Sequence, residues 1–162
     1  MDYRLKRLSA LDLALMKTLL EVYGNAFGDL DTYTGGTPSD EYLHRLLNRR
    51  DFITIVALHD QAVVGGLSAY VLEKFERERS EIYIYDLAVD ERHRRRGVAT
   101  ALIAELRRIG GAIGAYVIFV QADPGDAPAI ALYTSLGTRE DVHHFDISTD
   151  GSSRSGQPEI TK

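Results

Sequence analysis

A basic, glycine-containing turn follows an apolar strand near the middle of the chain. It reads Arg92-His93-Arg94-Arg95-Arg96-Gly97 and opens a helix. The free N–H groups at a helix N-terminus favour an anion, and arginines beside them add charge-assisted hydrogen bonds. Glycine allows close approach to the backbone because it carries no Cβ. The turn therefore predicts a phosphate-binding site, with a solvated basic turn as the alternative.

An acid lies on the strand directly before this turn. Asp86 interrupts an apolar run that continues through Val89. A carboxylate there could accept a proton from an amine, directly or through water, and its charge would hold a cationic substrate. The alternative is an acid that ends a strand and faces solvent. Glu81, at the start of the same strand, is a competing base that could instead bind a substrate amine.

Composition limits the class of protein. A chain of 162 residues with 44% hydrophobic content can form one domain with a proper core. The net charge of −5 opposes nucleic-acid binding and favours cationic partners. No apolar run approaches the roughly 18 residues of a membrane helix, and the first residues lack a signal-peptide stretch, so a cytoplasmic protein is expected. Cysteine is absent and the five histidines lack metal-ligand spacing, so neither thiolate chemistry nor a metal is expected.

Hydrophobic periodicity predicts the elements that position these residues. Strands are expected at 3–8, 52–58, 62–72, 81–89, 115–121 and 139–147, and helices at about 9–23, 39–47, 97–109 and 128–136. Gly110-Gly111 is interpreted as the stop of the third helix. The order favours an α/β (α+β) fold, with a single mixed, largely antiparallel sheet and a central parallel β-α-β unit flanked by helices. We expect one domain over residues 1–148 and a flexible tail over residues 149–162.

The basic turn resembles the acetyl-CoA-binding motif of the GCN5-related N-acetyltransferase superfamily. The superfamily consensus, Gln/Arg-x-x-Gly-x-Gly/Ala, reads here Arg94-x-x-Gly97-x-Ala99. The resemblance implies the superfamily's fold, with acetyl-CoA as co-substrate. It also implies that the backbone of residues 87–89 pairs with the pantetheine arm at a splayed strand.

A second segment is similar to a later motif of the superfamily, Ala-x-x-Leu-Tyr-x-x-x-Gly. Residues 129–137 read Ala-x-x-Leu-Tyr-x-x-Leu-Gly. The resemblance implies that Tyr133 lies near the thiol sulfur and acts as general acid; by periodicity alone it would be interpreted as a core tyrosine. Where the superfamily often has Asn, three residues before the Ala, this chain has Asp126, which departs from the pattern. The expected catalytic residues are thus Asp86 and Tyr133, and the expected cofactor-binding residues are Leu87, Ala88, Val89, Arg94, Arg95, Arg96, Gly97, Val98, Ala99, Thr100 and Asp126.

A wider pattern narrows the resemblance to the aminoglycoside 3-N-acetyltransferases of the gentamicin/fortimicin type. It is carried by residues 27–29, 70–76, 79–89, 114–117, 120–123, 131–133 and 144–147. It implies transfer of acetyl to the 3-amino group of a 2-deoxystreptamine aminoglycoside, by direct attack in a ternary complex, giving antibiotic resistance. A polycationic sugar suits a cleft lined by acids. The expected substrate-binding residues are Asp29, Glu81, Tyr83, Asp123 and Asp146.

Three other functions remain open from the sequence. The nearest is acetyl transfer to another small polyamine or amine metabolite. A non-catalytic acyl-CoA sensor is the second, although a pure binder needs neither Asp86 nor Tyr133. A nucleic-acid-binding module is the third and is opposed by the acidic net charge. The oligomeric state does not follow from the sequence, but members of the superfamily often form dimers, so a homodimer is one expectation.

Overall fold

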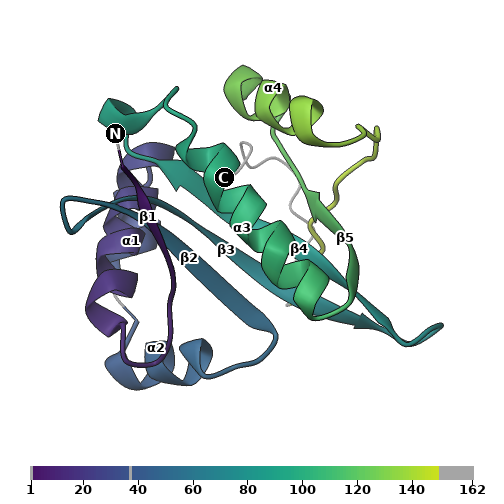
Figure 1. Ribbon diagram of the computed structural model, residues 1–162, viewed down its shortest axis with the longest axis horizontal. Coiled ribbons are helices and arrows are strands. Elements are labelled where there is room, and N and C mark those ends of the chain that lie inside the picture. The colour runs from purple at the N-terminus through teal and green to yellow at the C-terminus, as the bar shows by residue number, and fades with distance from the viewer. Residues whose placement is uncertain (1, 37, 150–162) are drawn as a thin grey trace. The chain divides into compact units, whose positions relative to one another are not determined.

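The computed structural model describes residues 2–36 and 38–149, and the chain divides into two compact units after Gln121 (Figure 1). The first unit holds a sheet and the helices that pack on it. The second unit, from Ala122, holds helix α4, Ala127–Leu136. The expected tail, residues 149–162, lies outside the described residues from position 150 onward.

Five strands form one mixed sheet within the described residues. Its order is β1-β2-β3-β4-β5, with β1 to β4 antiparallel and β5 parallel to β4. The strands are β1 (Arg4–Arg7), β2 (Phe52–His59), β3 (Ala62–Lys74), β4 (Arg79–Val89) and β5 (Ala115–Val120). The parallel pair is joined through helix α3, because parallel neighbours need a crossover connection. The predicted mixed sheet with a parallel β-α-β unit is therefore confirmed.

Helices cover both faces of the sheet. Figure 1 shows α3 (Val98–Ala112) crossing one face, while α1 (Leu13–Phe27) lies on the other. Helix α2 (Asp40–Leu47) has Ser39 as its N-cap, and the Ser39 side chain accepts a hydrogen bond from the Tyr42 N–H. Two short turns of helix complete the unit, the π-helical η1 (Asp31–Gly35) and the 3-10 helix η2 (Glu91–His93). No helix in the described part of the chain has the length and apolar character needed to cross a bilayer.

The core follows from the alternation of side chains along the strands. One set of buried residues joins α1 and α2 to the sheet: Leu8, Met16, Leu19, Tyr23, Leu43, Leu47, Phe52, Val56, Leu58, Val63 and Ala88. On β2, the intervening residues Ile53 and Ile55 are equally buried and point to the opposite face. That face packs against Leu102 and Leu106 of α3, both fully buried. Strand β2 is apolar at every position except Thr54 and His59, because both its faces are covered.

The third helix is longer than predicted, because Gly110-Gly111 does not stop it. Helix α3 continues to Ala112, and the left-handed residue that follows is Gly114, with φ +76°. Gly110 serves packing instead: a Cβ built there would lie 3.0 Å from Cδ1 of Ile82. The glycine therefore lets the helix approach β4 closely, a requirement that helical periodicity does not reveal.

The predicted strand at residues 139–147 is wrong. The structure has no regular element between Gly137 and Thr149. The apolar side chains of this segment are largely exposed, with Val142 at 72%, Phe145 at 79% and Ile147 at 89%. Alternating residues form a strand where a neighbouring strand accepts their backbone hydrogen bonds, and within the described residues the sheet pairs no strand with this segment.

Candidate active site

Strand β4 leaves β5 halfway along its length. The parallel ladder ends at Ile84, and beyond it no strand of the described residues pairs with that edge of β4. The ladder to β3 is irregular at the same point: Ser68 pairs with Asp86 and Ala69 with Ile84, so Tyr85 is an extra residue. Such a bulge bends a strand and redirects its side chains. Residues 85–89 of β4 therefore have no strand partner on this edge among the described residues, and this stretch includes residues 87–89, which are expected to pair with a pantetheine arm.

Asp86 lies at this bulge, and both of its carboxylate oxygens accept hydrogen bonds. The Tyr33 hydroxyl donates to Oδ1 at 2.9 Å, and the buried Ser68 hydroxyl donates to Oδ2 at 3.1 Å. Hydrogen bonds to the charged form of a carboxyl group favour that form. Burial, followed by the charge of Asp86, raises the pKa of Tyr33, so its O–H remains a donor. The site is therefore a fixed anion at the point where the sheet opens.

Tyr23 lies beside this pair, on α1. Its hydroxyl is fully buried and close to Ser68, yet it meets no partner with hydrogen-bond geometry among the described residues. Burial, and then the negative charge of Asp86, raise the pKa of Tyr23 well above its ordinary value. The side of Asp86 that faces α1 is therefore built from neutral hydroxyl groups.

Glu81, the competing base, is already paired. The Tyr116 hydroxyl donates to its carboxylate, and Nζ of Lys74 lies 3.2 Å from Oε1. The hydrogen bond from Tyr116 and the pairing with Lys74 lower the pKa of Glu81. A carboxylate held this way is a poorer proton acceptor and has less charge to offer a substrate. We therefore keep Asp86 as the proposed base.

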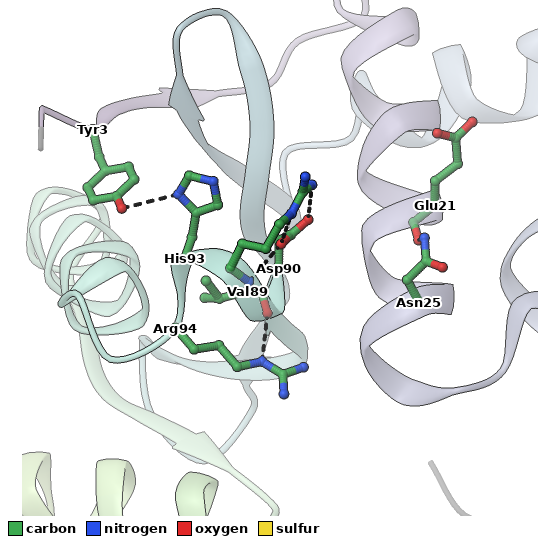
Figure 2. Close-up of polar contacts among 8 residues, drawn as sticks. Tyr3, Glu21, Asn25, Val89, Asp90, His93 and Arg94 are labelled. Atoms are coloured by element: carbon green, nitrogen blue, oxygen red, sulfur yellow. Dashed lines mark hydrogen bonds and ion pairs between the residues drawn. The ribbon is translucent and has the colours of Figure 1, made fainter.

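The turn between β4 and α3 is held by its own side chains (Figure 2). Asp90 accepts the Arg92 N–H at 2.9 Å and pairs with the Arg92 guanidinium group, which lowers the pKa of Asp90 to about 2. The Arg94 side chain points toward the end of β4, where its Nε donates a hydrogen bond to the Val89 carbonyl at 3.0 Å. On the other side of the turn, the Tyr3 hydroxyl lies 3.2 Å from Nδ1 of His93. These contacts fix the path of the chain into α3.

The N-terminus of α3 fits a phosphate group. Arg95 and Gly97 are both left-handed, with φ +60° and +80°, so the turn curls in the manner of an anion-binding nest. Helix α3 has no side-chain cap and no acid in its first turn. A Cβ built on Gly97 would meet nothing within 4 Å, so the space above the helix end is open. Uncapped N–H groups facing open space are what a phosphate needs.

The expected cofactor residues are not equivalent in this turn. Arg95 and Arg96 are exposed, whereas Arg94 is engaged by the backbone of β4. The Val98 side chain is 2% exposed and belongs to the core, so only its N–H group could face a ligand. Ala99 and Thr100 follow it in the first turn of α3. The backbone N–H groups at the start of α3 and the exposed side chains of Arg95 and Arg96 are therefore the anion-binding candidates.

Asp29 and Tyr83, two of the expected substrate-binding residues, lie in the first unit and form hydrogen bonds there. Asp29 follows α1 and, with Asp31, lines a pocket of about 300 Å³. Its Oδ1 accepts the Thr32 N–H at 3.1 Å, and hydrogen bonding from the Thr32 side chain, with that from its backbone second, lowers the pKa of Asp29. The Tyr83 hydroxyl donates to Oε1 of Gln121 at 3.1 Å, and its ring stacks on Phe119 with centroids 4.9 Å apart. Asp29 offers a carboxylate at a pocket, while Tyr83 is tied to β5.

The remaining candidates lie in the second unit. Asp126 is the N-cap of α4, where its Oδ1 accepts the Ala129 N–H at 3.0 Å. This is the task that an Asn would also perform there. Burial, with the charge of Asp126 second, raises the pKa of Tyr133 to about 12, so its hydroxyl stays protonated at neutral pH. Asp123 and Asp146 are exposed acids, and His144 lies 3.3 Å from the Asp146 carboxylate.

Sequence reasoning missed Tyr33 and Ser68. Tyr33 lies 53 positions from Asp86 along the chain, and Ser68 lies 18 positions away. Neither residue lies in a sequence motif that indicates catalysis or cofactor binding. The pairing of β3 with β4 is the signal that could have indicated Ser68, because antiparallel partners on one face lie opposite each other.

Comparisons with known proteins agree on one family. The model of the acetyltransferase (GNAT) family matches residues 14–138. The chain is similar to a solved aminoglycoside acetyltransferase from an uncultured soil metagenomic sample, with 57% identity and a TM-score of 0.91 over 92% of this chain and 99% of that one. A second aminoglycoside acetyltransferase from an uncultured soil metagenomic sample, solved in complex with trehalose and with sisomicin, is 34% identical, with a TM-score of 0.83 over 90% of this chain and 95% of that one. A comparison with curated proteins found no match.

Proposed function

The chain belongs to the acetyltransferase (GNAT) family and has its fold, and on that premise we propose that it acetylates an aminoglycoside antibiotic with acetyl-CoA. We further propose that the acceptor is the 3-amino group of the 2-deoxystreptamine ring, and that the reaction gives antibiotic resistance. The observation that carries the proposal is the Asp86 carboxylate, held by two donors where β4 opens away from β5. The 57% identity to an aminoglycoside acetyltransferase supports the substrate class.

Asp86 has the charge and position to prepare the acceptor amine. An aminoglycoside amine is an ammonium ion at neutral pH and must lose a proton before it attacks a thioester carbonyl carbon. In the proposal Asp86 attracts the ammonium group and takes its proton, directly or through water. Tyr33 donates to one oxygen of Asp86 and Ser68 to the other, so the carboxylate is held at a fixed place on β4.

Tyr133 is the proposed proton donor to the leaving group. As the new C–N bond forms and the C–S bond breaks, the sulfur takes the electron pair of that bond and a proton from the Tyr133 hydroxyl. The proton that the nitrogen loses on becoming an amide restores Tyr133, directly or through water. The pKa of about 12 supports a hydroxyl that is protonated before the reaction. The chain has no cysteine that could carry an acetyl group, which agrees with direct attack in a ternary complex.

Acetyl-CoA binding is proposed for the open edge of β4 and the start of α3. The N–H groups of Val98, Ala99 and Thr100, with the guanidinium groups of Arg95 and Arg96, would hold the pyrophosphate. The backbone of residues 87–89 would hydrogen-bond the pantetheine arm. The uncapped helix end and the space above Gly97 support this assignment.

The test measures CoA release from acetyl-CoA with gentamicin, spermidine and a lysine peptide as acceptors. We expect fast turnover with gentamicin, and two-dimensional NMR of the product should show acetylation at the 3-amino nitrogen. Asp86→Asn serves as the control for background hydrolysis. Turnover with spermidine alone would assign the enzyme to small polyamines, and acetylation at another nitrogen would overturn the proposed position. Binding of acetyl-CoA without transfer to any amine would favour the sensor.

A further inference from the structure

Tyr33 joins the segment after α1 to the carboxylate on β4. It lies in η1, and its ring packs against Tyr23 and Phe27 of α1, with centroids 5.8 and 5.6 Å apart. From this position its hydroxyl reaches Oδ1 of Asp86 at 2.9 Å. The ring is thus held by aromatic packing, and its one polar atom is directed at the proposed base.

The segment that carries Tyr33, residues 28–36, is seated closely on α1. A Cβ built on Gly24 would lie 3.0 Å from Cδ2 of Leu30 and 3.3 Å from Cβ of Tyr33, so glycine is what allows this approach. The Asp29 N–H donates to the Gly24 carbonyl at 3.0 Å, and the Tyr33 N–H donates to the Asp29 carbonyl at 3.3 Å. Asp29, a proposed substrate-binding acid, is therefore linked through the backbone to the residue that contacts Asp86.

We propose that Tyr33 is a positioning residue for Asp86, through which residues 28–36 orient the carboxylate toward the acceptor amine. The inference rests on the proposed function. The Tyr33 O–H holds Oδ1 and Ser68 holds Oδ2, so the carboxylate plane is fixed by donors from two separate elements. Asp29 lies in the same segment, residues 28–36, and would meet the positive charges of the acceptor. A shift of this segment on α1 would therefore change the hydrogen bond from Tyr33 to Asp86.

In this proposal the hydrogen bond from Tyr33 also affects the pH range over which Asp86 is ionised. A hydrogen bond to a carboxylate stabilises the ionised form, so its loss moves protonation of Asp86 to higher pH. The titratable groups that the described contacts place near this carboxylate include Tyr23 of α1, Tyr33 of η1, Tyr70 of β3 and Tyr85 of β4, together with the Asp29 carboxylate. The tyrosines do not ionise in the acid range, and the pKa of Asp29 is lowered. Asp29 is thus the other carboxyl group here that titrates in the acid range, and following the Asp86 carboxyl carbon itself assigns an acid-side change to Asp86.

The test is Tyr33→Phe, which keeps the aromatic packing and removes the donor. We expect the acid limb of the pH profile of kcat/KM for gentamicin to move to higher pH by about one unit. Affinity for CoA should be unchanged, because the contacts described for the Tyr33 side chain are with α1 and Asp86 and none is with a proposed CoA-binding residue. Tyr42→Phe is the matched control: Tyr42 is a half-exposed tyrosine of α2 whose ring lies under Arg45. It should leave the profile in place.

A readout without catalysis separates this inference from the proposed function. The Asp86 side-chain carboxyl carbon can be followed by ¹³C NMR in the free protein during a pH titration, with Asp86→Asn assigning the signal. We expect its midpoint to rise in Tyr33→Phe and, in the same direction, in Gly24→Ala, where the new Cβ displaces the segment and keeps the hydroxyl. An unchanged midpoint in Tyr33→Phe overturns the inference even if gentamicin is acetylated. A raised midpoint in a protein that acetylates no amine supports the positioning contact and refutes the enzyme's proposed substrate.

Discussion

Gly97→Ala tests the assignment of the α3 N-terminus to the cofactor, and the chain supplies a matched control. Gly97 and Gly114 lie at opposite ends of α3 and are both left-handed, with φ of +80° and +76°. Neither would place a new Cβ within 4 Å of another group. The two substitutions therefore impose the same backbone strain without a clash, and they differ in their distance from the proposed phosphate site.

The expected loss of stability is small and equal for both variants. A left-handed non-glycine residue costs roughly 1–2 kcal/mol. Alanine recovers about 0.4–1 kcal/mol by restricting the unfolded chain. The net loss of about 1 kcal/mol should lower the Tm by about 2–4 °C for a chain of this size. Thermal unfolding followed by circular dichroism measures it.

Binding of CoA should separate the two variants. The methyl group of Gly97→Ala enters the open space above the helix end, where the proposal places the pyrophosphate. We expect its Kd for CoA, measured by isothermal titration calorimetry, to rise at least about tenfold, which corresponds to about 1.4 kcal/mol. Gly114→Ala should bind CoA as the parent protein does. Equal CoA affinity for both variants, at equal loss of stability, would refute the phosphate assignment.

Three further variants test the other parts of the site. Asp86→Asn should lower kcat for gentamicin by about a hundredfold or more, the scale of general-base catalysis, and raise its KM, with CoA affinity unchanged; a loss confined to CoA binding would contradict the acceptor-side role. Tyr133→Phe should lower kcat with little change in CoA affinity, and an unchanged kcat would assign Tyr133 to packing. The hydrogen bond from Arg92 lowers the pKa of Asp90 from 3.8 to about 2, so the charged form adds stability above pH 3.8 that is lost as the pH falls toward 2. Asp90→Asn should therefore flatten the stability profile in that window, as measured by urea unfolding; a profile parallel to the parent's would show that the pair contributes nothing.

The order of the elements could be predicted because it depends on neighbours in the chain. The apolar runs of β2 and β3, the Ser39 cap of α2 and the glycine-containing turn before α3 all appear where the local pattern indicates. The turn could be interpreted chemically for the same reason: arginines, glycine and helix start lie within a few residues.

The same local reasoning failed where the outcome depends on a distant partner. Gly110 looks like a helix stop, yet it lies inside α3 because Ile82 on β4 needs the space of a side chain. Residues 139–147 alternate like a strand, yet they form none in the described structure, since alternation supplies one face of a strand and not its hydrogen-bond partners.

By itself the sequence determined that this chain has a mixed sheet, a parallel crossover and a basic, glycine-containing turn that follows an acid on the strand. The tertiary structure alone decided what surrounds that acid. It brought Tyr33 from the segment after α1 and Ser68 from β3 to the two oxygens of Asp86, and it paired Glu81 with Lys74. Hydrogen bonds act over about 3 Å, so which donor meets a carboxylate is set by strand register and helix packing rather than by residues adjacent in the chain.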